Sequence, residues 1–108
     1  MARIEIAKAP VTTSAPQAQR RSRVLLVDDD ERNLLALSEV LDPIADVVTA
    51  TSGRVALREL LRDEFAVILL DVFMPEMDGY ETASLIRKRA QTARIPIIFL
   101  SAVNKETE

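Results

Sequence analysis

Residues 66–81 read AVILLDVFMPEMDGYE and join a strand-like apolar run to a charged end. The apolar residues 66–70 lead directly into Asp71, and the turn-forming residues Pro75 and Gly79 follow soon after. An apolar run of this length, bounded by turn residues, is typical of a strand buried on both faces of a sheet. Burial alone gives no reason for a carboxylate at the end of such a strand. Asp71 therefore indicates a function at the tip of the strand.

The chain from residue 23 onward alternates short apolar runs with helical periods. Strands are predicted at 24–27, 45–50, 66–70 and 95–100, and helices at 31–41, at 52–62 with Ser52 as the cap, and after Asp78. Asp78 and Glu81 have the spacing of a capping box. Continuous apolar strands separated by helices predict a parallel sheet covered on both faces, because parallel neighbours need crossover connections. The predicted fold class is α/β, a doubly wound parallel sheet.

Each predicted helix carries an apolar stripe that is expected to face the sheet. The stripes are Leu34, Leu37 and Leu41 in the first helix, Ala56, Leu57, Leu60 and Leu61 in the second, and Ala83, Ile86 and Ala90 in the third.

The composition is that of one small soluble domain. The 108 residues are 48% hydrophobic and 29% charged, and no stretch approaches the length of a membrane span. The net charge of −3 argues against a nucleic-acid surface or an anionic membrane as partner. The absence of cysteine and histidine excludes disulfides, thiolate catalysis and imidazole general bases on this chain. We expect a cytoplasmic protein whose partners are proteins or ions.

Residues 1–22 are predicted to be a flexible tail, which leaves residues 23–108 as the domain. The segment contains no Leu or Phe, carries Pro10 and Pro16, and is rich in Ala, Thr, Ser and Gln. Residues 3–6, RIEI, alternate in a way that would allow them to add to a sheet edge. The arginines at 20, 21 and 23 are expected to be a solvated flank.

Acidic residues follow two of the predicted strands. Asp28, Asp29 and Asp30 follow the first strand, Asp71 ends the third, and Ser101 follows the fourth. Ligand sites of open parallel sheets lie beyond the carboxyl ends of the strands, where the winding reverses, and neighbouring strands are about 5 Å apart. Asp29 and Asp71 are therefore expected to converge if their strands are neighbours.

A cluster of carboxylates requires a proton or a cation at neutral pH. An oxygen-only site with room for water and a phosphate oxygen suits Mg²⁺ best. An aspartate beside Mg²⁺ with a hydroxyl nearby is a place where the carboxylate could act as nucleophile on a phosphoryl group. The alternative is structural: Asp28 to Glu31 as a helix N-cap region, and Asp71 as the cap of a turn.

Three segments carry a resemblance to a known family. VLLVDDDERNLLAL (24–37), LLDVFMPEMDGYE (69–81) and IPIIFLSA (95–102) resemble the receiver domain of two-component response regulators and hybrid sensor kinases. The resemblance runs from about Arg23 to the end of the sequence, with the motifs in the family's order. It implies a flavodoxin-like receiver fold.

The resemblance implies a role for five residues. Asp71 matches the phosphoacceptor, and Ser101 matches the hydroxyl residue that contacts the phosphoryl group. Asp28 and Asp29 match the acidic pair of the family. Mg²⁺ is then held by Asp29, Asp71 and the backbone carbonyl of Phe73, while Asp28 acts through water. The implied function is phosphorelay signalling, in which a partner histidine kinase or phosphotransfer protein donates the phosphoryl group from its own histidine.

The family has five strand–helix units, and the sequence stops where the fourth helix would begin. We therefore expect an incomplete receiver, without the fifth strand, the last helices and the phosphate-binding lysine. Lys105 is interpreted as a solvated residue at a helix start. The exposed edge formed by residues 95–100, and the sheet face beside it, are expected to favour a homodimer.

Two other functions fit the sequence less well than a receiver domain does. An aspartyl-nucleophile hydrolase is disfavoured because its D-x-D pattern would require an acid where Phe73 stands. Nucleotide binding is disfavoured because Gly53 and Gly79, the two glycines of the chain, do not form a phosphate-binding loop. The prediction is a signalling module rather than an enzyme. The alternative is a truncated receiver that takes no phosphate and acts as a protein-interaction or dimerisation fragment.

Overall fold

Four strands and three helices alternate along residues 21–100, the part of the chain that the computed structural model describes. In chain order they are β1 (Ser22–Val27), α2 (Glu31–Leu41), β2 (Ala45–Ala50), α3 (Gly53–Arg62), β3 (Val67–Asp71), α4 (Gly79–Arg87) and β4 (Ile97–Leu100). The predicted strands and helices are confirmed, and each boundary agrees with the sequence-based prediction to within a few residues.

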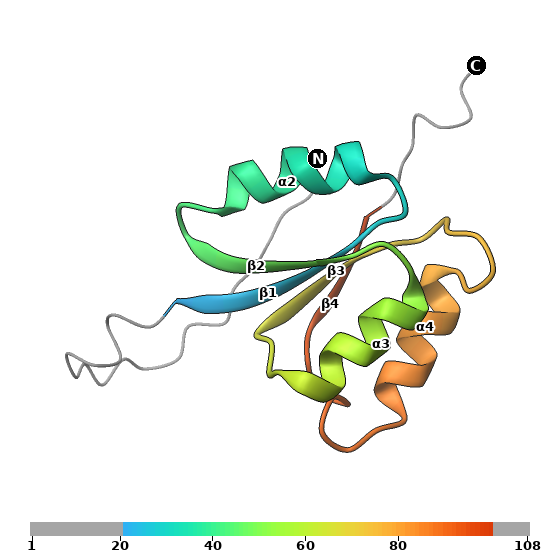
Figure 1. Ribbon diagram of the computed structural model, residues 1–108. Helices are drawn as coiled ribbons and strands as arrows, with labels where there is room; N and C mark the ends of the chain where they lie inside the picture. The colour runs from blue at the N-terminus through green and yellow to red at the C-terminus, as the bar shows by residue number, and fades with distance from the viewer. Residues whose placement is uncertain (1–20, 101–108) are drawn as a thin grey trace, which may run out of the picture.

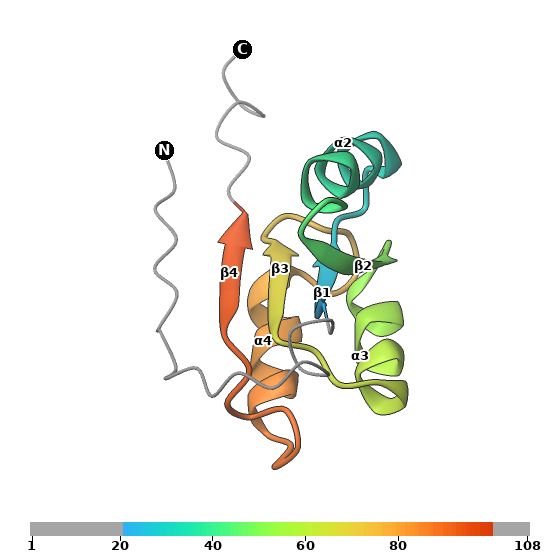
Figure 2. The same ribbon diagram turned by 90° about the vertical axis from the view of Figure 1, so that its left-hand side faces the viewer.

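The strands form one parallel sheet in the order β2-β1-β3-β4. After β1 the chain moves outward to β2, and it then crosses to the other side of β1 to form β3. The winding therefore reverses between β1 and β3. Helix α2 covers one face of the sheet, and α3 and α4 cover the other (Figure 1). Figure 2 shows β4 beside β3 at one edge of the sheet.

The core is aliphatic and centres on β1 and β3. Leu25 and Val27 of β1 and Ile68 and Leu70 of β3 are fully buried and belong to one cluster with residues of α3 and α4. Leu26 points to the opposite face by strand alternation and is also fully buried. Because β1 and β3 are buried on both faces, the packed core holds their carboxyl ends, where the acidic residues lie, in fixed positions.

Two residues predicted to face the core do not. Leu61 is 63% exposed. The buried face of α3 carries Gly53, Ala56 and Leu60, and Leu61, one residue after Leu60, is rotated by about 100° away from it. Ala90 is exposed because α4 ends at Arg87. Both predictions were wrong at a helix end, where the position of the last turn is not fixed by the apolar period.

Two of the three arginines predicted to form a solvated flank, Arg21 before β1 and Arg23 within it, are partly exposed and also make polar contacts. The Arg21 guanidinium donates to the carbonyls of Asp42 and Ala45, the latter at 2.8 Å, and Arg23 forms an ion pair with Asp63 at 3.2 Å. Strand β1 begins at Ser22, inside the segment predicted to be a tail. Residues 1–20, which include RIEI, and residues 101–108, which include Ser101 and Lys105, lie outside the described residues.

Candidate functional site

Three carboxylates meet at the carboxyl ends of β1 and β3, where the sheet winding reverses. Asp28 and Asp29 follow β1, and Asp71 is the last residue of β3. One carboxylate oxygen from each lies within 4.8 Å of the others. Asp71 is 2% exposed and Asp28 is 5% exposed, whereas Asp29 is exposed. The structure therefore confirms that the predicted acids converge.

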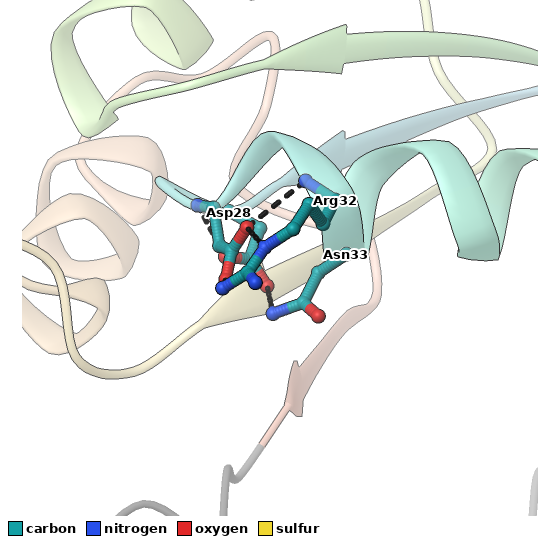
Figure 3. Close-up of polar contacts among 4 residues, drawn as sticks. Asp28, Arg32 and Asn33 are labelled. Carbon is teal, nitrogen blue, oxygen red and sulfur yellow. Dashed lines mark hydrogen bonds and ion pairs between the residues drawn. The ribbon is translucent and has the colours of Figure 1, made fainter.

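Hydrogen bonds hold both oxygens of the Asp28 carboxylate. The backbone N–H of Asp30 donates to Oδ1 at 2.8 Å, and the side-chain amide of Asn33 donates to Oδ2 at 3.2 Å. Figure 3 shows Asn33 reaching back from the first turn of α2 to Asp28. The burial of this charged group is offset by these two donors.

Asp30 is the N-cap of α2, so the capping role falls on this acid and not on Asp28 or Asp29. Its side chain accepts from the backbone N–H of Arg32 at 2.9 Å and from the Arg32 guanidinium at 3.0 Å. The hydrogen bonds from the Arg32 side chain and backbone lower the pKa of Asp30, and the same pairing raises the pKa of Arg32.

Asp71 and Phe73 are joined by a local hydrogen bond. The backbone N–H of Phe73 donates to Oδ1 of Asp71 at 3.3 Å, and the Phe73 side chain is 58% exposed. Val72 and Met74, on either side of Phe73, are buried. The backbone N–H of Phe73 therefore lies beside the Asp71 carboxylate.

The loop from β3 to α4 is packed tightly against the end of β3. The Gly79 N–H donates to the Val72 carbonyl at 2.8 Å, and a Cβ at Gly79 would lie 2.3 Å from the carbonyl oxygen of Asp71. Only glycine fits at this close approach. Glu76 has φ of 71°, and the Met77 N–H donates across it to the Pro75 carbonyl at 2.7 Å, which is the pattern of a γ-turn.

The donor set fits a hard divalent cation. The three side chains offer only oxygen atoms, two of the three are buried, and they are close enough for their charges to repel without a cation. Carboxylate and carbonyl oxygens suit Mg²⁺, whereas softer metals are selected by sulfur ligands.

Asn33 is the contact that sequence reasoning missed. A partial signal for it was present: with Asp30 as N-cap, Asn33 is the third residue of the helix, and a polar side chain at this position can reach back toward the cap. The sequence alone could not show that the side chain reaches Asp28.

The family follows from a comparison with known proteins. A model of the response regulator receiver domain matches residues 24–108. The chain belongs to the response regulator receiver family. It is a receiver domain of phosphorelay signalling, with the flavodoxin-like fold of its solved relatives.

Curated relatives are multidomain proteins of which the chain matches a part. It is 40% identical over 78 residues to a Vibrio cholerae protein named "Probable cyclic di-GMP phosphodiesterase", covering 72% of this chain and 18% of that protein. It is 37% identical over 92 residues to the sensor protein GacS of Pseudomonas syringae, covering 81% of this chain and 10% of GacS. The family is one of signalling domains, and the chain spans less than a fifth of either relative.

Solved structures show the same fold. The N-terminal domain of a response regulator receiver protein from Methanoculleus marisnigri superposes with a TM-score of 0.73 at 32% identity, over 75% of this chain and 67% of that one. The response regulator TrrA of Thermotoga maritima, solved in complex with Mg²⁺-BeF, gives a TM-score of 0.70 at 32% identity, over 78% of this chain and 72% of that one.

Within residues 21–100, no helix combines the length and apolarity needed to span a bilayer.

Proposed function

We propose that Asp71 is the phosphoacceptor of this receiver domain. The observation that carries the proposal is its position: it is 2% exposed, it ends the central strand β3, and its carboxylate lies within 4.8 Å of those of Asp28 and Asp29. Two further carboxylates beside a nucleophile hinder its attack on an anionic phosphoryl group, unless they bind a cation that the reaction needs.

The transfer itself is a displacement at phosphorus. One Asp71 carboxylate oxygen attacks the phosphorus atom, a P–O bond to Asp71 forms, and the P–N bond to the donor imidazole breaks. The imidazole nitrogen keeps the electron pair of the broken bond. The backbone N–H of Phe73, 3.3 Å from Oδ1, favours one orientation of the carboxylate for the attack. The product is an aspartyl phosphate on Asp71.

Asp29, Asp71 and the backbone carbonyl of Phe73 would hold Mg²⁺, with Asp28 acting through a water molecule. When bound, the ion supplies positive charge that offsets the carboxylates and the phosphoryl oxygens. The proposal is supported by the clustering of the three carboxylates and by the similarity to TrrA, solved with Mg²⁺-BeF. Ser101, which lies outside the described residues, is proposed to contact the phosphoryl group.

The proposed donor is the phosphohistidine of a cytoplasmic histidine kinase or phosphotransfer protein. The 108 residues contain no histidine, so a donor phosphohistidine would lie outside this sequence. Within the proposal the chain is a signalling module whose chemistry is limited to its own phosphorylation. The domain begins slightly before the predicted boundary at residue 23, because β1 starts at Ser22 and Arg21 donates to the Ala45 carbonyl.

A homodimer through β4 is proposed on a separate observation. Among the described residues β4 pairs on one side only, with β3, and Phe99 is 40% exposed while Ile97, Ile98 and Leu100 are half-buried. Strands with an apolar open edge favour association with another strand. Sedimentation velocity at rising concentration tests this: a dimer is expected, and a monomer throughout would contradict the proposal.

Intact-mass measurement tests the phosphoacceptor. The chain is incubated with Mg²⁺ and acetyl phosphate, beside the variants Asp71→Asn and Asp30→Asn. We expect a gain of one phosphoryl group in the unchanged chain and in Asp30→Asn, where the acceptor is intact. The gain should be absent in Asp71→Asn and when EDTA replaces Mg²⁺.

The opposite result would favour an interaction module. A chain that binds Mg²⁺ but gains no phosphoryl group would have the metal site of a receiver without its chemistry. A gain that persists in Asp71→Asn would place the acceptor elsewhere and contradict the proposal.

A further inference from the structure

We infer that Asn33 is a positioning residue that holds Asp28 in the orientation the metal site needs. The inference rests on the proposed function above, because it assumes that the three carboxylates bind Mg²⁺. It concerns a residue outside the carboxylate set: Asn33 lies on α2, five residues after Asp28, and contacts the site through one hydrogen bond.

The contacts of Asp28 carry the inference. The side chain is 5% exposed and has one donor on each oxygen, the Asp30 backbone N–H on Oδ1 and the Asn33 amide on Oδ2. A carboxylate bonded at one oxygen still rotates about that bond, whereas donors on both oxygens fix its plane. The Asp30 donor is backbone and comes with the fold. The Asn33 donor is a side chain, so this residue decides whether the second oxygen is held.

The chemistry of the donor also suits a cation site. An amide donates a hydrogen bond without bringing a charge, so it orients the carboxylate and does not repel Mg²⁺. Arginine or lysine at this position would add a positive charge beside the ion. Groups that bond to direct metal ligands typically affect metal affinity by about 10- to 100-fold when they are removed, and because Asp28 acts through water the lower end of this range applies to Asn33.

The side chain has an ordinary alternative role. Asn33 is exposed as a residue, and a polar residue at this helix position can serve the helix alone. In that case its loss would change the stability of α2 and leave metal affinity unchanged. The hydrogen bond to buried Asp28, rather than to the backbone of the cap, favours the positioning role.

A double-variant cycle on Mg²⁺ affinity tests the inference. The unchanged chain, Asn33→Leu, Asp28→Asn and the double variant are titrated with MgCl₂, and binding is followed through backbone amide NMR shifts, which also detect weak binding. We expect Asn33→Leu to weaken Mg²⁺ binding about tenfold. In the Asp28→Asn background the same change should have no further effect, because Asn33 acts through Asp28.

Arg32→Met is the matched control. Arg32 lies one residue before Asn33 and bonds to Asp30, not to Asp28, so its removal tests whether any change in this turn weakens binding. Because it removes a positive charge near the site, Mg²⁺ affinity should stay the same or increase. Asn33→Ala serves as a second variant, and the melting temperature in EDTA shows whether each variant is folded.

The outcomes separate the two proposals. Equal Mg²⁺ affinity in the unchanged chain and in Asn33→Leu would overturn the role of Asn33 while leaving the metal site intact. Equal weakening with and without the Asp28 carboxylate would overturn the claim that Asn33 acts through Asp28. If the unchanged chain binds no Mg²⁺, the proposed function fails first, and this inference fails with it.

Discussion

Replacing Gly79 with alanine should destabilise the domain more than the same change at the other glycine, Gly53. Both glycines are the first residue of a helix that follows a capping side chain, Asp78 for α4 and Ser52 for α3. Helix propensity and unfolded-state entropy therefore contribute nearly equally to the two substitutions. The difference between them isolates what each added methyl group meets.

At Gly79 the methyl group meets only backbone. Its carbon would lie 2.3 Å from the Asp71 carbonyl oxygen and 2.9 Å from the Val72 Cα, and no side-chain rotation can relieve these contacts. At Gly53 the nearest atoms are Thr82 Oγ1 at 2.3 Å and Met77 Sδ at 2.9 Å. The Met77 side chain can move, but Thr82 is fully buried and its hydroxyl donates to the Asp78 carbonyl at 2.8 Å, so Thr82 yields only at the cost of that bond. Overpacking typically costs about 1–3 kcal/mol, and a clash with backbone belongs at the upper end.

We expect Gly79→Ala to lose about 2–3 kcal/mol of unfolding free energy and Gly53→Ala about 1–2 kcal/mol, because moving Thr82 costs its hydrogen bond whereas the backbone at Gly79 cannot move aside. For a domain of this size the larger loss corresponds to a fall in melting temperature of roughly 8–20 °C. Urea unfolding followed by circular dichroism measures both variants. A loss in Gly79→Ala no larger than that in Gly53→Ala would refute the reasoning from backbone contact.

Three further changes test local features of the fold. The pKa of Asp30 is lowered in the folded state by Arg32, so its carboxylate stabilises the fold above its ordinary pKa of 3.8, and this contribution is lost as the pH falls through and below that value. Between pH 5 and pH 3, the unfolding free energy of Asp30→Asn should therefore fall less than that of the unchanged chain, as measured by the urea midpoints of both proteins at the two pH values. An equal fall in the two proteins would contradict this. Thr92 is 3% exposed, and its hydroxyl donates a hydrogen bond to the Ile86 carbonyl at 2.6 Å. Thr92→Val should therefore lower the unfolding free energy by about 1 kcal/mol. An unchanged value in the same urea assay would show that the bond contributes nothing. Glu76 has a positive φ that favours glycine, so Glu76→Gly should raise the unfolding free energy by about 0.5–1 kcal/mol, and a loss would mean that its side chain makes a compensating contact.

The strands and the meeting of the acids could be predicted because both follow from strong local signals. The apolar run before Asp71 has no stable place outside a doubly covered sheet, and parallel strands bring their carboxyl ends to one edge. The capping box of Asp78 and Glu81 was also predicted from its spacing and is present, with the Glu81 N–H donating to the Asp78 side chain at 2.8 Å. These predictions depended on a period or a spacing and not on a distance between remote residues.

What could not be predicted depends on packing in three dimensions. The requirement for glycine at position 79 comes from the Asp71 carbonyl, eight positions earlier in the chain, and becomes visible only when α4 is docked against β3. The contact from Asn33 to Asp28 depends on the angle at which α2 leaves β1. The exposure of Leu61 depends on what lies beside the last turn of α3, which no helical period specifies.

The two interpretations of the strand-end acids, a structural cap and a reactive site, are not alternatives in this fold. Asp28 accepts from the backbone N–H of Asp30 at 2.8 Å, and Asp71 accepts from the backbone N–H of Phe73 at 3.3 Å. At the ends of both neighbouring strands, therefore, an aspartate side chain accepts a hydrogen bond from the backbone two residues later. Such a bond turns the chain out of the sheet, which is a structural role. It also orients a buried carboxylate and offsets part of the cost of its charge, which is what a metal ligand or a nucleophile needs. Aspartate suits the end of each strand because one side chain can both end the strand and leave a positioned, charged oxygen at the switch point.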